Sequence, residues 1–394
     1  TAVKISPNYD NPTVWVKDAS RAVGVVSNLL SDTVREAFVT EIAEDYEQVR
    51  ERHKGKTSRR RVVSLEQARA NRVDIDWPSY APPKPRMTGL QAFADYPLEE
   101  IAQYIDWTPF FWTWEMKGKF PQILEDETIG EEARKLFDDA GAMLRRIIDE
   151  KWLQARAVIG LFPANAVDDD IEIYDDESRR QVRVAVHHLR QQNEKPPGRP
   201  NLCLSDFIAP KETKVEDYLG AFAATAGVGL DERVKAFEQA NDDYNAILLQ
   251  ALADRLAEAF AERMHERVRR EFWAYAPDED LDNEALIKEE YTGIRPAPGY
   301  PACPDHTEKG LLWELLDAEG NAGIRLTESY AMWPASSVSG WYFSHPRSQY
   351  FVVNRVGRDQ VADYAERKGM SFEEAEKWLM PVLAYEPDEE KEAV

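Results

Sequence analysis

The stretch VIGLFPANAVDDDIEIYDDESRRQVRVAVHH, residues 158–188, decides the fold class of this chain. Val158–Phe162 and Asp170–Tyr174 have the short, bounded apolar pattern of buried strands, and Gln181–His188 alternates valines with polar residues. A turn signal at Phe162–Asn165 separates the first two strands. Short connections join antiparallel neighbours, because parallel strands need a long crossover. The stretch therefore predicts an antiparallel sheet within an α+β fold.

Helical patterns surround this stretch. The longest, at 240–273, repeats apolar residues at every fourth position, so this helix must cross most of the core. A second amphipathic helix is predicted over Ile129–Leu153. Ser371 and Glu374 form a capping-box pattern at the start of a short last helix that runs through Leu379. Other helices are expected at 311–316 and 359–368, and other strands at 205–208, 218–225, 340–343 and 349–353.

The front of the chain resembles the end of an α/β unit. A strand is predicted at Thr13–Val16, and helices are predicted at 20–30 and 33–53. The basic run at 53–61 is interpreted as a solvated linker rather than a nucleic-acid site, because the chain as a whole is acidic. Four prolines between Pro78 and Pro85 then favour an extended backbone.

These features predict three parts. Residues 1–55 form the end of one domain, 56–87 a linker, and 88–394 a single main domain with a central twisted antiparallel sheet and flanking helices. The chain begins with Thr rather than Met, so we expect it to be a piece of a longer protein.

The composition excludes several classes of function. The net charge of −23 disfavours nucleic acid and anionic membrane surfaces as partners. Two cysteines a hundred residues apart, Cys203 and Cys303, predict free thiols and exclude zinc held by a cysteine cluster. No signal pattern and no long apolar run are present, so a soluble cytoplasmic protein without a membrane span is expected.

Common catalytic motifs are missing from the sequence. There is neither a phosphate-binding P-loop nor a Gly-x-Ser-x-Gly elbow, and Thr225–Gly229 is interpreted as a plain turn. Glu258, Glu262 and His265 share one face of the longest helix. Their spacing resembles half of a di-iron ligand set, but a solvated acidic face is the favoured interpretation because a second Glu-x-x-His is absent. No metal site is predicted.

Three segments suggest a ligand site. Asp106 lies among aromatic residues in IDWTPFFWTW, where it either meets a cationic partner or caps the helix that Pro109 begins. Arg295 opens RPAPGYPACP, where it either clamps a carboxylate or lies in a surface loop. The run 333–346 supplies small residues and then Trp-Tyr-Phe, which form either a wall for a flat ring or a core strand. An amino acid joined to a nucleoside would satisfy all three segments.

At these motifs the chain resembles the C-terminal reactivation domain of cobalamin (vitamin B12)-dependent methionine synthase. The similar stretches are IDWTPFFWTW, GLFPAN, DDIEIY, HHLRQQ, ADRLAEAFAERMHERVR, GIRPAPGYPACPDHTEK, LTESYAMWP and SGWYFSHP, and they span residues 70–385. The front end, through VWVKDASRAVGVVSNLLSD, resembles the closing strand and helix of the preceding Rossmann-like cobalamin-binding domain.

The resemblance implies a C-shaped α+β domain that binds S-adenosylmethionine (AdoMet) on its inner surface. It assigns Asp106 to the ammonium group of AdoMet and Arg295 to the carboxylate. Further contacts are expected from Ala297 and Tyr300, and packing against the adenosine or sulfonium from Tyr342 and Phe343. Glu258 and Glu289 are expected to add negative potential near the site.

The resemblance also implies a reaction and partners. AdoMet supplies a methyl group, and reduced flavodoxin or a related reductase supplies an electron, so that cob(II)alamin is converted to methylcobalamin. This keeps the full enzyme competent to transfer methyl groups from methyltetrahydrofolate to homocysteine. Cobalamin would be held mainly by the cobalamin-binding domain of the same polypeptide, and zinc only by an absent homocysteine module. No general acid or base is expected in this chain, because orientation of the reactants suffices.

Two other functions stay open at this point. A free-standing AdoMet methyltransferase would need a glycine-rich AdoMet turn and a local base, and the sequence shows neither. A non-catalytic docking module for a reductase would need no intact set of ligand-binding residues.

Overall fold

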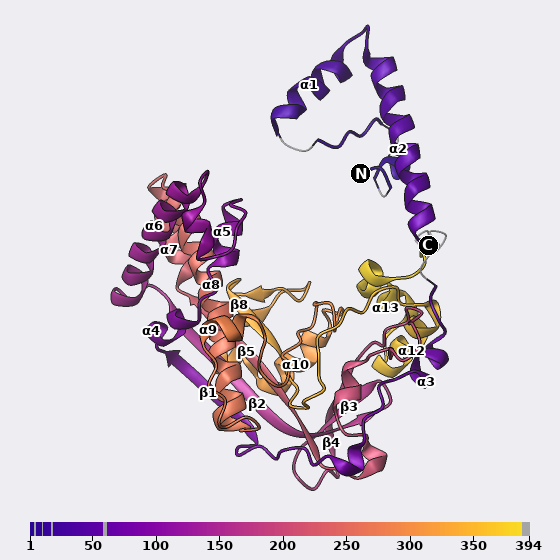
Figure 1. Cartoon of the computed structure of the whole chain (residues 1–394), viewed down its shortest axis with the longest axis vertical. Coiled ribbons are helices and arrows are strands. Elements are labelled where there is room, and N and C mark those ends of the chain that lie inside the picture. Colours follow the sequence, from indigo (N-terminus) through magenta and orange to yellow (C-terminus); the bar gives the residue numbers. More distant parts are fainter. Residues whose placement is uncertain (4, 10, 17–18, 58–60, 388–394) are drawn as a thin grey trace. The chain divides into compact units, whose positions relative to one another are not determined.

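The computed structural model describes residues 1–394 apart from 4, 10, 17–18, 58–60 and 388–394 (Figure 1). The described residues form two compact units, Thr1–Val63 and Ser64–Val394. The division after Val63 falls inside the segment in which the sequence predicts a boundary. The assignment of residues 1–55 to a cobalamin-binding domain stays a prediction.

The first unit consists mainly of two helices, α1 (Ala19–Leu30) and α2 (Arg35–Thr57), as predicted. The expected strand at Thr13–Val16 is wrong, since the described residues of this unit contain no strand that could pair with it. Instead, the backbone N–H of Trp15 donates to the Tyr46 hydroxyl at 2.9 Å. Of the basic run at 53–61, residues 53–57 form the end of α2 rather than a linker, and residues 58–60 lie outside the described residues.

An antiparallel sheet forms the centre of the second unit. Its strands are β1 (Gly89–Tyr96), β2 (Gln154–Val167), β3 (Asp170–Tyr174), β4 (Val182–His187), β5 (Asp217–Val228) and β8 (Ser337–Tyr342). The strand order is β4-β3-β2-β5-β8, and β1 pairs with β2. The predicted antiparallel α+β fold is confirmed, because every pairing in the sheet is antiparallel. A separate ribbon pairs β6 (Arg325–Leu326) with β7 (Met332–Trp333).

Two strand predictions are wrong. Residues 205–208 lie in a 3₁₀ turn, Leu204–Phe207, because the Asp206 carboxylate accepts the Cys203 N–H at 2.9 Å and closes the turn. Residues 349–353 are extended but do not pair with a strand. There the Val353 N–H donates to the Pro301 carbonyl at 2.7 Å instead of to a ladder.

The predicted helices of the second unit are present, and the ten-residue helix at Leu230–Gln239 is an additional one. Their bounds are α3 (Leu65–Ala70), α4 (Leu98–Ile101), α5 (Thr108–Thr113), α6 (Gly130–Asp149), α7 (Leu230–Gln239), α8 (Asp243–Arg267), α9 (Asn283–Ile287), α10 (Glu308–Leu316), α11 (Ala318–Ala322), α12 (Arg358–Lys368) and α13 (Phe372–Leu379). Helix α8 continues into a π-helical turn at Val268–Phe272. The predicted cap of α13 is present, since the Ser371 hydroxyl accepts the Glu374 N–H at 3.1 Å.

The sheet is covered on both faces. Ile159, Leu161 and Phe222 point to the face that α8 covers, whereas Val158 and Ala221 point to the face that α10 and α11 cover. This alternation follows from the period of two along a strand. The C-terminal half of α8, which carries Glu258 and Glu262, is thereby placed beside β8.

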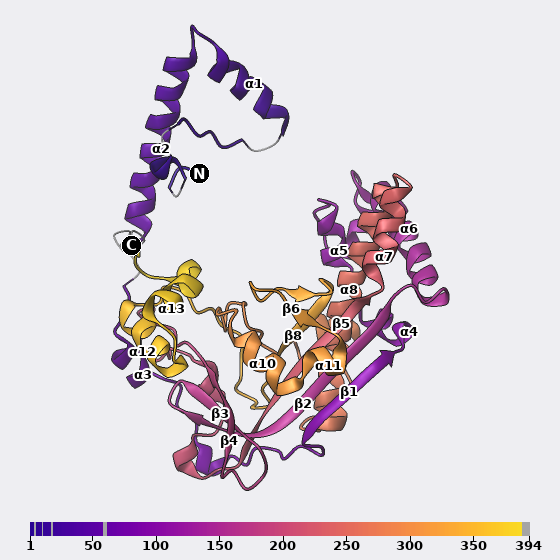
Figure 2. The same ribbon diagram turned by 180° about the vertical axis from the view of Figure 1, so that it is seen from behind.

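In the second unit, helices α5 to α8 rise from one end of the sheet and α12 and α13 lie at the other (Figures 1 and 2). Helix α10 and the β6-β7 ribbon lie between these ends. This unit therefore has the curved outline that the resemblance implies. None of its described helices, nor those of the first unit, is both long and apolar enough to cross a membrane.

Candidate functional site

The segment that begins with Arg295 lies against the end of strand β8. Ile294 and Phe343 exchange backbone hydrogen bonds of 3.1 and 3.0 Å, and the Trp341 N–H donates to the Pro296 carbonyl at 2.8 Å. Gly340 permits this approach, because a Cβ atom there would lie 2.6 Å from the Pro296 carbonyl oxygen. The small residues before Trp341 therefore let the Pro-rich segment dock on the strand.

A tight turn follows within this segment. The Gly299 N–H donates to the Cys303 carbonyl at 2.7 Å, and the Cys303 N–H donates to the Tyr300 carbonyl at 2.9 Å. Gly299 has a φ of +89°, which a residue with a side chain adopts only with strain. The turn presents Tyr300, whose side chain is exposed.

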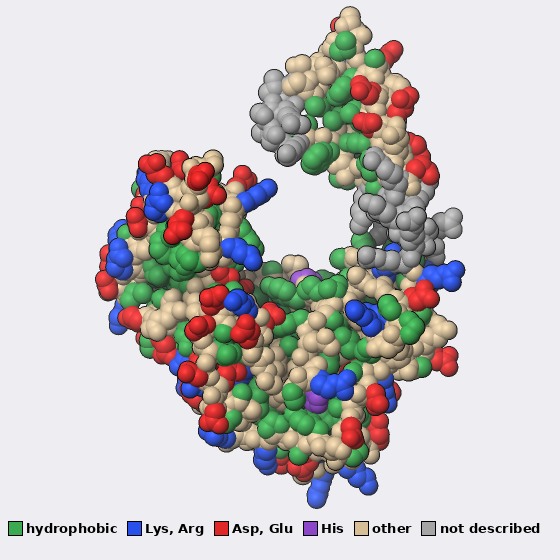
Figure 3. Space-filling model, viewed as in Figure 1, with side chains coloured by type: hydrophobic (Ala, Val, Ile, Leu, Met, Phe, Trp, Pro, Cys, Tyr) green, Lys and Arg blue, Asp and Glu red, His purple; other side chains and the backbone are tan. Residues whose placement is uncertain are grey.

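Two pockets border this segment and share three charged residues, Glu258, Glu289 and Arg295. The smaller, of about 220 Å³, is also lined by Asp106. The larger, of about 400 Å³, is also lined by Ala297 and Tyr300. The structure thus brings together six of the eight residues that the sequence analysis assigns to the ligand. In the space-filling view, acidic side chains gather on the face of the second unit between its two ends (Figure 3).

Arg295 is held by contacts to one of its nitrogens. Its Nη1 lies 2.7 Å from a Glu262 carboxylate oxygen, 3.1 Å from the Tyr291 hydroxyl and 3.3 Å from the His265 ring nitrogen Nδ1. Its Nε and Nη2 have no protein partner among the described residues. Burial opposes the charge, but Glu262 and Tyr291 outweigh burial and raise the pKa of Arg295. The guanidinium is therefore always charged and keeps two parallel N–H groups for a carboxylate.

The acidic residues of the pockets come from three different elements. Asp106 precedes α5, Glu258 is on α8, and Glu289 follows α9. Burial raises the pKa of Glu289, although the charge of Arg295 opposes this. One Asp106 oxygen accepts the Thr108 N–H at 2.9 Å, so this residue helps to cap α5 while it lines the pocket. The two alternatives for Asp106 are therefore compatible with each other.

The contact predicted for Tyr342 and Phe343 is not what the structure shows. Both side chains are 0% exposed and line neither pocket. The Tyr342 ring lies between two others, 4.7 Å from Phe222 and 5.2 Å from His265 by ring centroids. Helix α8 packs on β8, and Phe343 lies in the core cluster that contains Leu312 of α10, so the core-strand alternative holds for this pair. Tyr342 supports the pocket from behind, because Phe222 lines the larger pocket.

A second Tyr-Phe pair lines the larger pocket instead. Tyr350, Phe351 and Val352 border it, and the Arg295 N–H donates to the Tyr350 hydroxyl at 3.0 Å. Sequence reasoning treated these residues only as a β-like run. The sequence signal that could have identified them is the aromatic pair Tyr350-Phe351 shortly after Pro346.

The interpretation of Glu262 and His265 as a solvated face is also wrong. Glu262 is 8% exposed and His265 is 0% exposed, because Tyr291 and Tyr342 pack on the His265 ring. Burial, Arg269 and Arg295 all lower the pKa of His265, so the ring is neutral. No group of three possible metal ligands occurs among the residues that the structure describes.

Comparison with known proteins identifies the family. Residues 97–369 match the family described as "vitamin B12 dependent methionine synthase, activation domain". This chain belongs to that family. All the pocket residues named above lie within residues 97–369, the part of this chain that matches the family.

A solved structure agrees with this assignment. The activation domain superposes on a crystal structure of the MetH reactivation domain bound to AdoHcy with a TM-score of 0.81 and 58% sequence identity. The match covers 82% of this chain and 99% of that chain. The same architecture is therefore present in both proteins, and residues 97–369 form an activation domain of this family.

Proposed function

We propose that the two adjoining pockets bind AdoMet. Arg295 receives the ligand carboxylate through Nε and Nη2, and Asp106 receives the ammonium group. Tyr300, Tyr350 and Phe351 pack against the adenosine. The observation that supports this most is the convergence of Asp106 and Arg295 on connected pockets in a domain that is 58% identical to one bound to AdoHcy.

The charge balance of the pockets favours AdoMet. Glu262 already neutralises part of the Arg295 charge, while Asp106, Glu258 and Glu289 add carboxylates. AdoMet carries an ammonium and a sulfonium against one carboxylate, so its net charge is positive. A negative pocket attracts such a ligand, and the attraction is strong where water is excluded.

The role of the chain in the reaction is to bind and orient AdoMet. Cobalamin, when bound, supplies the metal centre that accepts the methyl group, and we assign it mainly to another domain because the two pockets have the size of sites for small ligands. A reductase such as flavodoxin would supply the one electron that reduces cob(II)alamin to cob(I)alamin, and AdoMet would then transfer a methyl cation to it and become AdoHcy. Ordering AdoMet lowers the entropic barrier, so no proton-transferring residue is required.

Calorimetric titration of AdoMet into the purified chain tests the proposal. Asp106→Asn is the sharper variant, because Asn keeps an oxygen for the Thr108 N–H and removes only the charge. Asp138→Asn, on the exposed face of α6, is the matched control. We expect the wild type and the control to bind alike and Asp106→Asn to bind at least about tenfold more weakly, the scale of one charged contact.

Other outcomes would redirect the assignment. Equal binding by Asp106→Asn would remove Asp106 from the ammonium contact. No binding by the wild type would contradict the proposal as a whole and favour the docking module for a reductase.

A further inference from the structure

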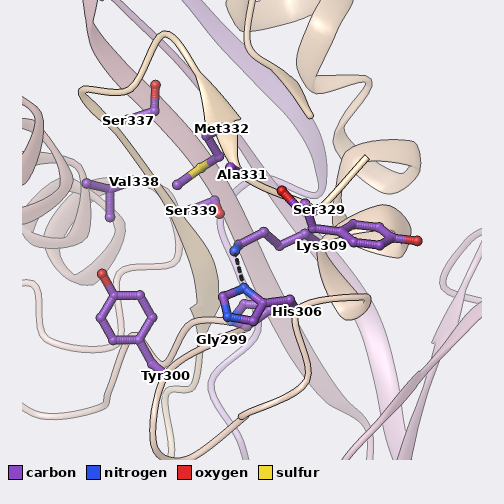
Figure 4. A pocket seen from close by; sticks show the side chains of 12 residues that line it. Gly299, Tyr300, His306, Lys309, Ser329, Ala331, Met332, Ser337, Val338 and Ser339 are labelled. Atoms are coloured by element: carbon purple, nitrogen blue, oxygen red, sulfur yellow. Dashed lines mark hydrogen bonds between the residues drawn. The ribbon is translucent and has the colours of Figure 1, made fainter. Parts of the chain in front are cut away.

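A third pocket, of about 400 Å³, adjoins the proposed AdoMet pockets. It lies between the turn at Pro298–Tyr300, the start of α10, the residues Ser329–Met332 and strand β8 (Figure 4). Tyr300, Val338 and Ser339 line both this pocket and the larger AdoMet pocket. The function proposed above does not use it.

Lys309 contributes a buried charge to this pocket, and no carboxylate of the described residues pairs with it. Its side chain lines the pocket, the residue is only 6% exposed, and its Nζ donates to His306 Nδ1 at 2.9 Å. Among the described residues, the other buried lysine and arginine side chains are paired with acids. Arg190 lies 2.7 Å from Asp169, and Arg269 lies 2.7 Å from Glu279.

The nearest acidic residue along the chain does not supply the missing charge. Glu308, next to Lys309, is fully buried and pairs with Lys368. Burial lowers the pKa of Lys309, and only the Cys303 thiol counteracts it. An uncompensated buried ammonium is costly, so a bound anion would stabilise the fold.

Two neighbouring groups strengthen the case for an anion. The Ser339 hydroxyl, in a residue only 2% exposed, lines the pocket and has no hydrogen-bond partner. The His306 ring lies against the Gly299 turn, and Figure 4 shows the Lys309 amine reaching it across the pocket. Because His306 Nδ1 accepts from Lys309, its other nitrogen carries the proton and is a further donor.

We propose that this pocket binds an oxyanion of the phosphate class. Lys309 is the counter-ion, and the Ser339 hydroxyl donates a hydrogen bond. A lysine ammonium is a point charge that suits a tetrahedral oxyanion, whereas a planar carboxylate prefers the fork of an arginine. The pocket also lies at the N-terminal end of α10, where the helix dipole favours negative charge. The net charge of −23 argues against non-specific anion attraction.

Binding of an anion in this pocket would change the affinity of the neighbouring site for AdoMet. The Pro298–Tyr300 turn and strand β8 form walls of both sites, so the anion would order a wall that AdoMet also contacts. Such coupling is reciprocal. The anion site itself does not depend on the proposed function.

Thermal unfolding of the full chain in inorganic phosphate tests the proposal. Phosphate is varied from zero to ten times its apparent Kd at constant ionic strength with sodium chloride. We expect the melting temperature of the wild type to rise by about 2 °C. Lys309→Met, which keeps the volume and removes the charge, should show no rise. Lys288→Met, at an exposed lysine, should respond like the wild type.

The variants also distinguish specific binding of phosphate in this pocket from a general stabilisation of the fold by salt. In phosphate-free buffer Lys309→Met should melt no lower than the wild type, because it removes an unpaired buried charge. An equal phosphate shift in Lys309→Met, or no shift in the wild type, would overturn the proposal. Imidazole ¹⁵N NMR gives a second readout: a phosphate-dependent shift of His306 supports the site. A response to acetate that exceeds the response to phosphate would reject the phosphate class.

Discussion

At the scale of single residues, the hydrogen-bond partners of a charged side chain determine which of its donors are available to a ligand. Arg295 uses one nitrogen for Glu262, Tyr291 and His265 and leaves two nitrogens without protein partners. Lys309 has only a histidine. In both cases the donors without an acidic or protein partner, rather than the charge alone, are the groups available to a ligand.

Removal of the Arg295 guanidinium should weaken AdoMet binding. We expect Arg295→Ala to cost about 1.5–3 kcal/mol of binding free energy in calorimetry, the value of hydrogen bonds to a charged group. The variant also removes the nearer cationic partner of the buried Glu262 and leaves only Arg269, at 3.8 Å, so its thermal stability should fall. The double variant Arg295→Ala, Glu262→Gln should recover the stability but not the affinity. Wild-type affinity in either variant would remove Arg295 from the carboxylate contact.

His188 should make the stability of the domain sensitive to acid. Its ring is buried and neither nitrogen has a hydrogen-bond partner. Burial lowers the pKa of His188 from 6.5 to about 3. Between pH 6.5 and about 3 the His188 ring binds a proton in the unfolded state but not in the folded state. The free energy of unfolding is therefore highest above pH 6.5 and decreases as the pH falls toward 3.

The His188→Leu variant isolates this effect. Below pH 6.5 the wild type should lose roughly 1.4 kcal/mol of unfolding free energy per pH unit relative to the variant. Urea unfolding at several pH values measures the difference. A difference that does not change with pH would mean that the native ring takes up a proton as easily as the unfolded one.

At the scale of elements, backbone hydrogen bonds join strand β8 to the Pro-rich segment that borders the pockets. The Trp341 N–H and the Pro296 carbonyl join them, and the segment then turns at Gly299 to present Tyr300. The affinity for AdoMet should therefore depend on the backbone of β8, although no β8 side chain is assigned a charged contact.

Gly340→Ala tests this dependence. A Cβ atom would meet the Pro296 carbonyl oxygen at 2.6 Å, so the segment must move away from the strand. We expect AdoMet binding to weaken more than about tenfold while circular dichroism keeps the native spectrum, since a displacement near 1 Å suffices for such losses. Gly141→Ala is the control, because its Cβ would meet only the Arg145 guanidinium at 3.7 Å. Undiminished binding by Gly340→Ala would show that the segment is not positioned by β8.

At the scale of the whole molecule, residues between Ser64 and the first strand belong to the second unit. Arg69 of α3 lies 2.8 Å from Asp169, whose side chain is 1% exposed, and 2.9 Å from Asp363. Trp77 is buried in the same region. The segment predicted as a linker thus supplies a counter-charge and a core side chain.

Two truncations distinguish the role of this segment. A chain that begins at Ser64 should keep the melting temperature and the AdoMet affinity of the full chain, since the division between units lies there. A chain that begins at Thr88 should melt several degrees lower, because Asp169 loses Arg69 and the site of Trp77 becomes exposed. Equal melting temperatures of the two truncations would show that residues 64–87 do not stabilise the domain.

The sequence by itself determined the antiparallel sheet and the long helix α8, and its motifs predicted Asp106 and Arg295, which line one pocket in the structure. These features follow from local periodicity, turn chemistry and motifs, which a sequence records directly. The strand prediction at 205–208 failed where a side-chain carboxylate, Asp206, closed a turn that periodicity does not show.

The tertiary structure alone decided which residues line the two pockets. Two Tyr-Phe pairs lie eight residues apart, and packing of α8 and α10 on the sheet buries Tyr342 and Phe343 while Tyr350 and Phe351 line the pocket. Packing also pairs Glu262 with Arg295 and leaves Lys309 without an acid. A period of two or of 3.6 residues identifies faces within one element, but only the neighbouring elements determine which face is covered.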